Sequence, residues 1–402
     1  MTSTAQIFIE RRLQAIREQH LFRQLTPLDH GTTPWITVGD RRMLNLSSNN
    51  YLGLADHPRL KEAAIAAIRD YGCGAGSSRL VTGTTRLHEQ LEHRLAIFKG
   101  CESALLFSSG YHANMGVISS LARENAVVFS DELNHASIID GCRLARGASR
   151  MEADCKVYPH CNTTVLAQQL EELDQTDHHG LRLVVTDSVF SMDGDVAPLA
   201  EIAKLCEKHD ALLVVDEAHA TGCLGPGGRG LVAELHTDAL VISVNTLSKA
   251  FGSIGAFTTG SNQIKEFLTN VARQFIFTTA LPPADVATSL AVLDILEEDP
   301  DLPQRLQQKA SFFRTGLQAL GFQTLASKTQ IIPLLIGDSQ LALQIAQSLR
   351  EHGVYAVAIR PPTVPMGASR IRFSVMASHT QEDLAFALEM IGKVGKEMGV
   401  IA

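Results

Sequence analysis

Short apolar runs alternate with longer amphipathic stretches over most of this chain. The runs contain mainly Val and Leu, and they fall at residues 104–107, 126–130, 181–186, 212–216 and 240–244. Runs of this kind are typical of strands that are buried on both faces of a mostly parallel sheet. Between them, helical spacing of apolar residues predicts helices at 58–71, 87–99 and 112–121. This strand–helix alternation predicts an α/β domain with a wound, mostly parallel sheet.

The pattern differs at both ends of the chain. Near the N-terminus, Ile9, Leu13 and Ile16 recur at helical spacing, which predicts an amphipathic helix over residues 5–25. A strand pair is expected at 35–38 and 42–46, turning at Gly39-Asp40. We therefore predict an N-terminal arm over residues 1–45 and a large domain over residues 46–285.

After Pro282-Pro283 the apolar pattern predicts a smaller α+β domain over residues 286–402. Its predicted helices and strands are a helix at 284–297, strands at 330–336 and 371–375, and covering helices at 302–319 and 339–352. Thr380 and Asp383 have the spacing of a capping box that opens a last helix.

Composition excludes several classes of protein. Hydrophobic residues make up 45 % of the chain and charged residues 19 %, as in a compact globular protein. The net charge is −8 and no dense basic run is present, so we expect no nucleic-acid partner. No apolar run approaches the roughly 18 residues that span a bilayer, and no signal peptide is visible at the N-terminus. We therefore expect a cytoplasmic protein without membrane contact.

The cysteine pattern favours free thiols over disulfides or a metal site. Seven cysteines are scattered along a chain that is large enough to fold without disulfide bonds. Cys155, His160 and Cys161 are ligand-type residues that lie close in sequence, but they form no paired CxxC frame. We therefore predict that the protein holds no metal ion.

Candidate chemistry gathers where the predicted strands end, which is where ligands bind in wound α/β sheets. The run ending at Asp216 is followed by His219, and a carboxylate there would suit a protonated pyridine nitrogen. Lys249 follows another run among small residues, and a crowded lysine loses its charge easily and attacks aldehydes. By itself, Asp216 could equally cap a helix or pair with an arginine, and Lys249 could be a surface residue.

Two further strand ends complete a pattern that suits a phosphorylated heteroaromatic ring. Gly110 lies at a turn before a helix, whose N–H groups bind anions, and Thr246 adds a hydroxyl. His135 offers a flat imidazole for stacking on a ring, although a histidine in a loop is common. No GxxxxGK[ST] motif competes for a nucleotide. Together the groups predict pyridoxal 5′-phosphate (PLP) as the cofactor.

These segments match a known family. Over essentially the whole chain the sequence resembles the α-oxoamine synthases, which are PLP enzymes of fold type I. The resemblance is carried by long segments that include SSNNYLGL (47–54), SSGYHANMG (108–116), VVDEAHATG (214–222), TLSKAFG (246–252) and IRPPTVPMG (359–367).

The resemblance implies roles for individual residues. Lys249 would bind the cofactor covalently and act as the base at the substrate α-carbon. Asp216 would pair with the pyridine nitrogen, His219 would reach the ring oxygen, and His135 would stack on the ring. The remaining cofactor contacts implied by the family are Gly110, Tyr111, Thr246 and Ser248 around the phosphate, and Ser191 near the ring oxygen.

The same resemblance implies substrate contacts and a partner. Asn49 and Arg372 would hold the amino-acid carboxylate, for which the arginine fork is suited. Arg360 would line the approach of the acyl-CoA. Thr278 and Thr279 would reach the phosphate of a neighbouring subunit, which implies a homodimer with shared active sites.

The reaction that the resemblance implies is the decarboxylative condensation of an amino acid with an acyl thioester. The stretch AIRPPTVPMG favours the member of biotin biosynthesis that joins L-alanine to a pimeloyl group on CoA or a carrier protein. Members that use glycine or serine are the alternative. A PLP-sensing regulator or an inactive subunit is disfavoured, because Lys249 is present and no DNA-binding module precedes the core.

Overall fold

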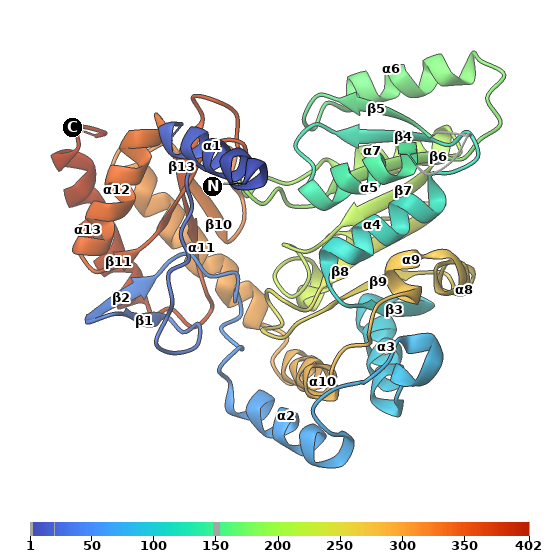
Figure 1. Cartoon of the computed structure of the whole chain (residues 1–402), viewed down its shortest axis with the longest axis horizontal. Coiled ribbons are helices and arrows are strands. Elements are labelled where there is room, and N and C mark those ends of the chain that lie inside the picture. Colours follow the sequence, from blue (N-terminus) through green and yellow to red (C-terminus); the bar gives the residue numbers. More distant parts are fainter. Residues whose placement is uncertain (1–2, 20, 148–152, 402) are drawn as a thin grey trace. The chain divides into compact units, whose positions relative to one another are not determined.

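A computed structural model describes residues 3–19, 21–147 and 153–401. Its contacts divide the chain into two compact units, which we describe separately (Figure 1). The large unit comprises residues 49–191 and 195–307. The small unit comprises the chain up to Ser48, residues 192–194 and residues from 308 onward.

The large unit is built on one seven-stranded sheet. In spatial order its strands are β3 (Ser103–Phe107), β9 (Ala256–Gly260), β8 (Val241–Thr246), β7 (Leu212–Asp216), β6 (Arg182–Asp187), β4 (Val127–Asp131) and β5 (Asp154–Tyr158). Strand β9 is antiparallel to both of its neighbours, and all other neighbouring pairs are parallel. The predicted mostly parallel sheet is therefore confirmed.

Helices cover both faces of this sheet, because its strands are apolar on both sides. Leu183 and Val185 of β6 belong to one core cluster and Val184, between them, to the other. The first cluster includes residues of α4 (Gly110–Leu121), α5 (Ala136–Gly147), α8 (Asn262–Val271) and α9 (Arg273–Ile276). The second includes residues of α6 (Thr163–Asp174) and α7 (Leu199–Lys208).

Three helices complete the large unit and place its boundary further along the chain than predicted. Helix α10 (Pro283–Glu298) packs on α2 (Pro58–Tyr71) and α3 (Arg86–Lys99). The division therefore falls after residue 307, within α11 (Leu302–Ala319), and not at residue 285. The Pro282-Pro283 pair opens α10 and does not separate domains, because proline is well tolerated in the first turn of a helix.

The small unit contains two three-stranded sheets. One has the order β1 (Trp35–Val38), β2 (Arg41–Asn45), β11 (Val354–Tyr355), and the other β10 (Ile331–Gly337), β13 (Ser369–Ser374), β12 (Val357–Ile359). Helices α12 (Ser339–Glu351) and α13 (Gln381–Glu397) pack on each other, and α12 also packs on both sheets. Because β2 pairs with β11, the predicted N-terminal arm belongs to the small unit.

Most of the predicted helices and strands are observed, with small shifts at their ends. The predicted helix over 5–25 is shorter, because α1 (Thr4–Glu18) ends at Glu18 and residues 21–28 are not helical. Position 20, inside the predicted range, lies outside the described residues. Thr380 and Asp383 form the predicted capping box of α13. Within the described ranges, no helix is both long and apolar enough to cross a bilayer.

One buried histidine joins the two ends of the chain inside the small unit. His379 is fully buried, its Nδ1 accepts a hydrogen bond from Met376 N, and its Nε2 lies 3.1 Å from the carbonyl oxygen of Asn45. Burial lowers the pKa of His379 to about 4, despite the hydrogen bond to Asn45. The neutral ring therefore fixes the N-terminal arm to the segment that precedes α13.

We predict that His379 makes the protein sensitive to acid. The unfolded chain binds this proton below pH 6.5 and the folded chain only below about 4, so the free energy of unfolding falls with pH in this window by up to about 3 kcal/mol. Urea unfolding at pH 7.0 and 4.5 should show a smaller pH effect in His379→Gln than in the parent. The control His179→Gln changes an exposed ring and should keep the parent slope.

Candidate active site

Two buried carboxylates mark the carboxyl end of the central strands. Asp187 ends β6 and Asp216 ends β7, and the two residues are direct partners in the parallel ladder. Their exposed fractions are only 3 % and 4 %. Asp216 accepts hydrogen bonds from Asn114 Nδ2 at 2.5 Å and from the backbone N–H of Ala218 at 2.7 Å. Neighbouring strands therefore bring two acidic groups to one buried place.

This pair of carboxylates calls for a positive charge. Burial and the charge of Asp216 together raise the pKa of Asp187 well above its ordinary value. A cationic group between these strand ends would relieve both the desolvation and the repulsion. A protonated pyridine nitrogen supplies such a charge, so the carboxylates fit the predicted cofactor. The side-chain Oδ1 of Asn114, which is buried without a hydrogen-bond partner, adds a polar atom at the same place.

Lys249 and His219, two of the predicted site residues, lie next to each other. The Nζ of Lys249 is 3.0 Å from His219 Nε2, and His219 Nδ1 is 2.7 Å from the hydroxyl of Tyr51. Tyr51 in turn donates a hydrogen bond to Asn49 Oδ1 at 3.0 Å. His219 and Tyr51 are buried, which fixes the imidazole with one nitrogen toward the lysine. Asn49 is thereby connected to Lys249 through two intervening side chains.

His135 is held as a neutral ring beside Asp216. Burial, together with the charge of Lys249, lowers the pKa of His135, although Asp216 opposes this. Its Nδ1 lies 2.7 Å from Ser137 Oγ, which accepts a hydrogen bond from Asn114. The same Asn114 side chain therefore orients both the imidazole and the carboxylate. A neutral, oriented imidazole suits stacking on a heteroaromatic ring.

The predicted phosphate group contacts also lie together. Gly110 opens α4, whose N-terminal N–H groups are suited to an anion. A Cβ at Gly110 would lie 3.8 Å from Cβ of Thr246, so the turn packs directly against the end of β8. Thr246 Oγ1 is 2.7 Å from Ser248 Oγ. Tyr111 is exposed, donates a hydrogen bond to Asp140 and presents its ring to His135 edge-on.

The other predicted residues lie in two places. Within the large unit, Ser191 lies inside a short hairpin that is closed by the bridge between Val189 and Val196. Thr278 and Thr279 follow α9 and line a small pocket with Ser108 of the phosphate turn. The two predicted arginines, Arg360 and Arg372, belong to the small unit.

Within the small unit, the two arginines have different surroundings. Arg372 is buried in β13 and donates to Ser374 Oγ at 3.0 Å. Arg360 lines a cavity of about 550 Å³ together with Arg23 and Arg350. Burial and the charge of Arg23 lower the pKa of Arg360, so an anion in this cavity would be favoured. Sequence reasoning missed Arg23 and Arg350. Arg23 lies far from Arg360 in the chain, and Arg350 belongs to a different element, α12.

A buried ion pair supports the loop that carries Asp216 and His219. Lys99 Nζ donates to Glu217 Oε2 at 2.5 Å and to Asn245 Oδ1 at 2.9 Å, and both charged side chains are fully buried. Glu217 also accepts a hydrogen bond from Val232 N. A Cβ at Gly230, where φ is +90°, would approach the Glu217 oxygens to 2.5 Å, so only glycine fits there.

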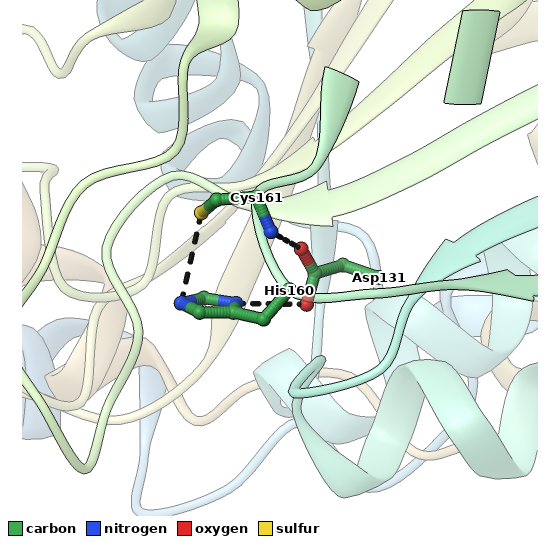
Figure 2. Close-up of side chains that lie close together, drawn as sticks. All are labelled: Asp131, His160 and Cys161. Atoms are coloured by element: carbon green, nitrogen blue, oxygen red, sulfur yellow. Dashed lines mark hydrogen bonds and ion pairs between the residues drawn. The ribbon is translucent and has the colours of Figure 1, made fainter. Parts of the chain in front are cut away.

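A second polar cluster lies beside the site, and it contains two of the three ligand-type residues that the sequence brings close together. Asp131, His160 and Cys161 bring one ligand-type atom each to within 4.8 Å of one another (Figure 2). The sequence suggested Cys155 as the third member, but the structure puts Asp131 there. Both imidazole nitrogens of His160 face carboxylate oxygens, of Asp131 at 3.0 Å and of Asp195 at 2.7 Å.

Comparison with known families agrees with this arrangement. The family model described as aminotransferase class I and II matches residues 41–391. The chain belongs to this family. The α/β architecture predicted from the sequence, a fold type I transferase, is therefore confirmed by the family and by the observed sheet.

Proteins that are similar to this chain over nearly their whole length include several named 8-amino-7-oxononanoate synthase. A protein of Geobacter metallireducens named 8-amino-7-oxononanoate synthase is 48 % identical over 97 % of this chain and 98 % of its own. One of the same name from Thermoanaerobacter pseudethanolicus is 45 % identical over 98 % of both chains. Among solved structures, a serine palmitoyltransferase from S. paucimobilis with a bound PLP–myriocin adduct is 30 % identical, with 98 % of both chains covered and a TM-score of 0.89.

We predict that the Lys99–Glu217 pair is required for a stable fold. Lys99→Met would leave Glu217 buried without its cation and should lower the free energy of unfolding by about 3–5 kcal/mol. Urea unfolding of the purified proteins measures this. The matched control is Lys208→Met, which breaks the exposed pair with Glu171 and should cost less than about 1 kcal/mol. Equal losses in both variants would contradict the role given to the buried pair.

Proposed function

We propose that this protein is a PLP-dependent 8-amino-7-oxononanoate synthase. It would condense L-alanine with pimeloyl-CoA, or with a pimeloyl carrier protein, to give 8-amino-7-oxononanoate, CO₂ and the free thiol carrier. The observation that carries this proposal is the 45–48 % identity, over 97 % or more of the chain, to proteins of that name. The cluster around Lys249 supplies the groups that the chemistry needs.

Each group at the strand ends has a proposed task in binding PLP. Lys249 would bond covalently to the aldehyde carbon, and Asp216 would neutralise the pyridine nitrogen. His219 and Ser191 would contact the ring oxygen, and His135 would stack on the ring. The phosphate would be held by Gly110, Tyr111, Thr246 and Ser248.

Bound PLP supplies a sink for the electrons released when a bond at the substrate α-carbon breaks. The chain's own residues decide which bond that is. Asn49 and Arg372 would hold the amino-acid carboxylate, and Lys249 would remove the proton from the α-carbon. The contact of Lys249 with His219 at 3.0 Å keeps the lysine amine in one position, where it can take up and return that proton.

The cavity of the small unit suits the anionic part of the acyl donor. Three arginines line it, and two of them, Arg350 and Arg360, have a buried Nε. Both candidate donors carry phosphate, and the pimeloyl chain ends in a carboxylate. We propose that Arg360 contacts one of these anions. Phe22, Val357 and Ile359 add apolar surface for a chain of methylene groups.

We further propose a homodimer with shared sites. Thr278 and Thr279 would reach the phosphate in a second copy of the chain. Large apolar side chains that are exposed near the two threonines support this proposal. Phe277, which precedes them in the chain, is 69 % exposed; Leu80 and Val81, which follow the bridge between Ser78 and Thr279, are 53 % and 73 % exposed. Such side chains are costly to leave in water and favour an interface. The predicted cytoplasmic location stays a prediction.

The alternative substrate pairs are glycine or serine with another acyl-CoA. The serine alternative draws support from the structural similarity to a serine palmitoyltransferase, but the identity there is only 30 %. The two functions differ in the amino acid that the enzyme accepts and in the length of the acyl chain. One methylene group changes specificity by only about 1–3 kcal/mol, so the choice must be measured.

Product analysis tests the proposed function. The holoenzyme is incubated with pimeloyl-CoA and L-alanine, glycine or L-serine, and release of CO₂, free thiol and product mass are recorded. We expect a kcat/KM at least about tenfold higher with L-alanine than with either competitor, with 8-amino-7-oxononanoate as the product. A preference for serine with palmitoyl-CoA, or for glycine with acetyl-CoA, would overturn the assignment while keeping the family.

The proposed role of Arg360 gives a second prediction. Arg360→Gln removes a charged contact worth about 1.5–3 kcal/mol, so the KM for pimeloyl-CoA should rise about tenfold or more. The KM for L-alanine should change little. Arg59→Gln, which removes an exposed arginine paired with Glu298, serves as the control and should leave both constants unchanged. An unchanged KM for the thioester in Arg360→Gln would exclude the residue from acyl-donor binding.

A further inference from the structure

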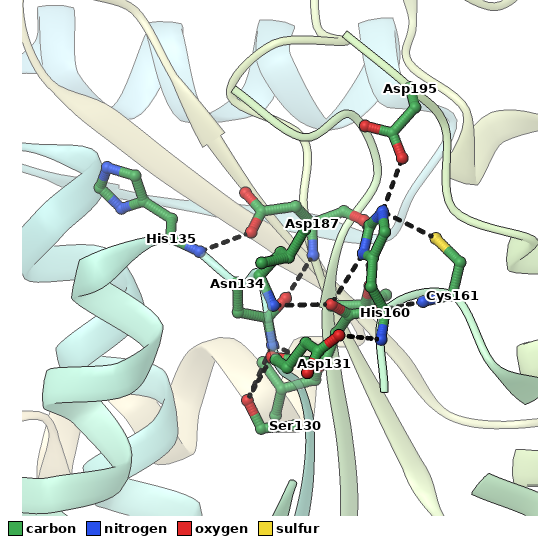
Figure 3. A network of polar contacts seen from close by, with 12 residues as sticks. Ser130, Asp131, Asn134, His135, His160, Cys161, Asp187 and Asp195 are labelled. Atoms are coloured by element: carbon green, nitrogen blue, oxygen red, sulfur yellow. Dashed lines mark hydrogen bonds and ion pairs between the residues drawn. The ribbon is translucent and has the colours of Figure 1, made fainter. Parts of the chain in front are cut away.

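His160 lies between two loops that carry proposed cofactor contacts. One loop follows β4 and runs from Asp131 to His135, and the other is the hairpin from Val189 to Val196 that carries Ser191. The imidazole reaches Asp131 of the first loop through Nδ1 at 3.0 Å. It reaches Asp195 of the second through Nε2 at 2.7 Å (Figure 3).

We propose that His160 is a positioning residue, an imidazolium that bridges Asp131 and Asp195 and thereby holds His135 and Ser191 in place for the cofactor. It touches neither substrate nor cofactor itself. The proposal rests on PLP being the cofactor, which is part of the proposed function, but not on the identity of the acyl donor or the amino acid.

On the first side, hydrogen bonds hold both ends of the loop that leads from Asp131 to His135. Asp131 also accepts hydrogen bonds from the backbone N–H groups of Leu133 and Cys161, which closes the start of the loop. Asn134 donates to Val185 O at 2.8 Å and accepts from Asp187 N at 3.0 Å. The next residue, His135, donates its backbone N–H to Asp187 Oδ2. The loop is therefore attached at one end to His160 and at the other to the end of β6.

On the second side, His160 is the hydrogen-bond partner of an otherwise poorly paired carboxylate. Asp195 is 8 % exposed, and its Oδ1 is buried without a hydrogen-bond partner. The backbone carbonyl of Asp195 accepts from Phe190 N, which closes the hairpin just before Ser191. The Phe190 ring packs edge-on against the imidazole, with ring centroids 4.3 Å apart. Loss of His160 would leave this carboxylate buried and uncompensated.

The contacts require the charged form of the ring. Each nitrogen faces a carboxylate oxygen, which can only accept, so both nitrogens must carry a proton. Burial lowers the pKa of His160, but the hydrogen bonds to Asp131, Asp195 and Cys161 outweigh it and raise the pKa to about 12. The acidic groups that face the ring are Asp131 and Asp195, with the thiol of Cys161 at 3.6 Å from Nε2.

The same atoms could in principle hold a metal ion instead of a proton. A metal at Nε2 would need Asp195 and Cys161 as further ligands, with Asp131 orienting the ring through Nδ1. The distance of 2.7 Å between Nε2 and the Asp195 oxygen suits a hydrogen bond. Two ligands of one zinc ion, each about 2.0–2.2 Å from the metal, would lie further apart in a tetrahedral site. The geometry therefore favours the proton.

The test compares PLP binding by five purified proteins: the parent, His160→Gln, Asp195→Asn, the double variant that combines these two substitutions, and Cys161→Ser. Equilibrium titration gives the dissociation constant of PLP, and circular dichroism of the bound cofactor in the visible range reports its orientation. We expect His160→Gln and Asp195→Asn each to weaken PLP binding by about tenfold and to reduce the dichroism. The double variant should bind PLP no more weakly than His160→Gln alone, because both substitutions remove the same interaction between His160 and Asp195. Cys161→Ser should stay within about twofold of the parent.

Two outcomes would overturn the proposal. If His160→Gln binds PLP within about twofold of the parent with the same dichroism, the bridge does not position the site. If the parent carries stoichiometric zinc that Cys161→Ser loses, the cluster is a metal site. Should His160→Gln fail to fold, Asp195→Asn, which keeps the side-chain shape, decides the question by the same measurements. A parent that binds no PLP would instead refute the proposed function.

Discussion

Two carboxylates are buried at the ends of adjacent strands of the large unit, and they require a positive charge close by. Asp187 and Asp216 are partners in the ladder between β6 and β7, and each is nearly inaccessible to water. Their burial is unfavourable unless a cation lies close by. The surrounding residues meet that requirement in part, with Lys249 near them and hydrogen bonds from Asn114 and from the backbone of Ala218 and His135. A pyridinium ring would supply the remaining positive charge.

Around this centre, the structure fixes each loop with its own buried polar contact. The Asp216–His219 loop is held by the Lys99–Glu217 pair. The His135 loop is held by Asn134, whose side chain is bonded to β6, and by the imidazole of His160. Removing these charged groups from water is unfavourable. The contacts nevertheless favour a single arrangement of the loops, because a buried charged group without its partner would strongly destabilise the fold. These contacts hold the loops of the site in one arrangement without a ligand.

The sequence predicted the frame well because the frame follows simple periodicities. Strands β4, β6, β7 and β8 are mostly apolar runs, because a strand that is buried on both faces needs apolar residues at nearly every position. The edge strand β5 and the antiparallel β9 were not predicted, since Asp154 and Lys156 interrupt the apolar residues of DCKVY and AFTTG is rich in threonine. The domain boundary was predicted too early because the change of pattern after Pro282-Pro283 was assigned to a new domain, whereas this pair begins α10, which packs on α2 and α3.

The candidate site was predictable where one residue type at a strand end carries the chemistry, as for Asp216 and Lys249. Residues that act through others gave no such signal. Tyr51, Asn114 and His160 are distant in sequence from the groups that they contact, and only the fold brings them to His219, Asp216 and Asp195. Arg360 and Arg372 belong to the small unit. There Arg360 lines a cavity, and Arg372 is buried in β13.

The central claim is that Lys249 binds PLP covalently. Reduction of the purified holoenzyme with borohydride, followed by proteolysis and mass spectrometry, tests it most directly, because reduction makes the bond between an amine and the PLP aldehyde permanent. We expect one phosphopyridoxyl group per chain, on the peptide that contains Lys249, and its loss in Lys249→Ala. A label on another lysine, or no label in protein saturated with PLP, would show that Lys249 does not bind the cofactor covalently.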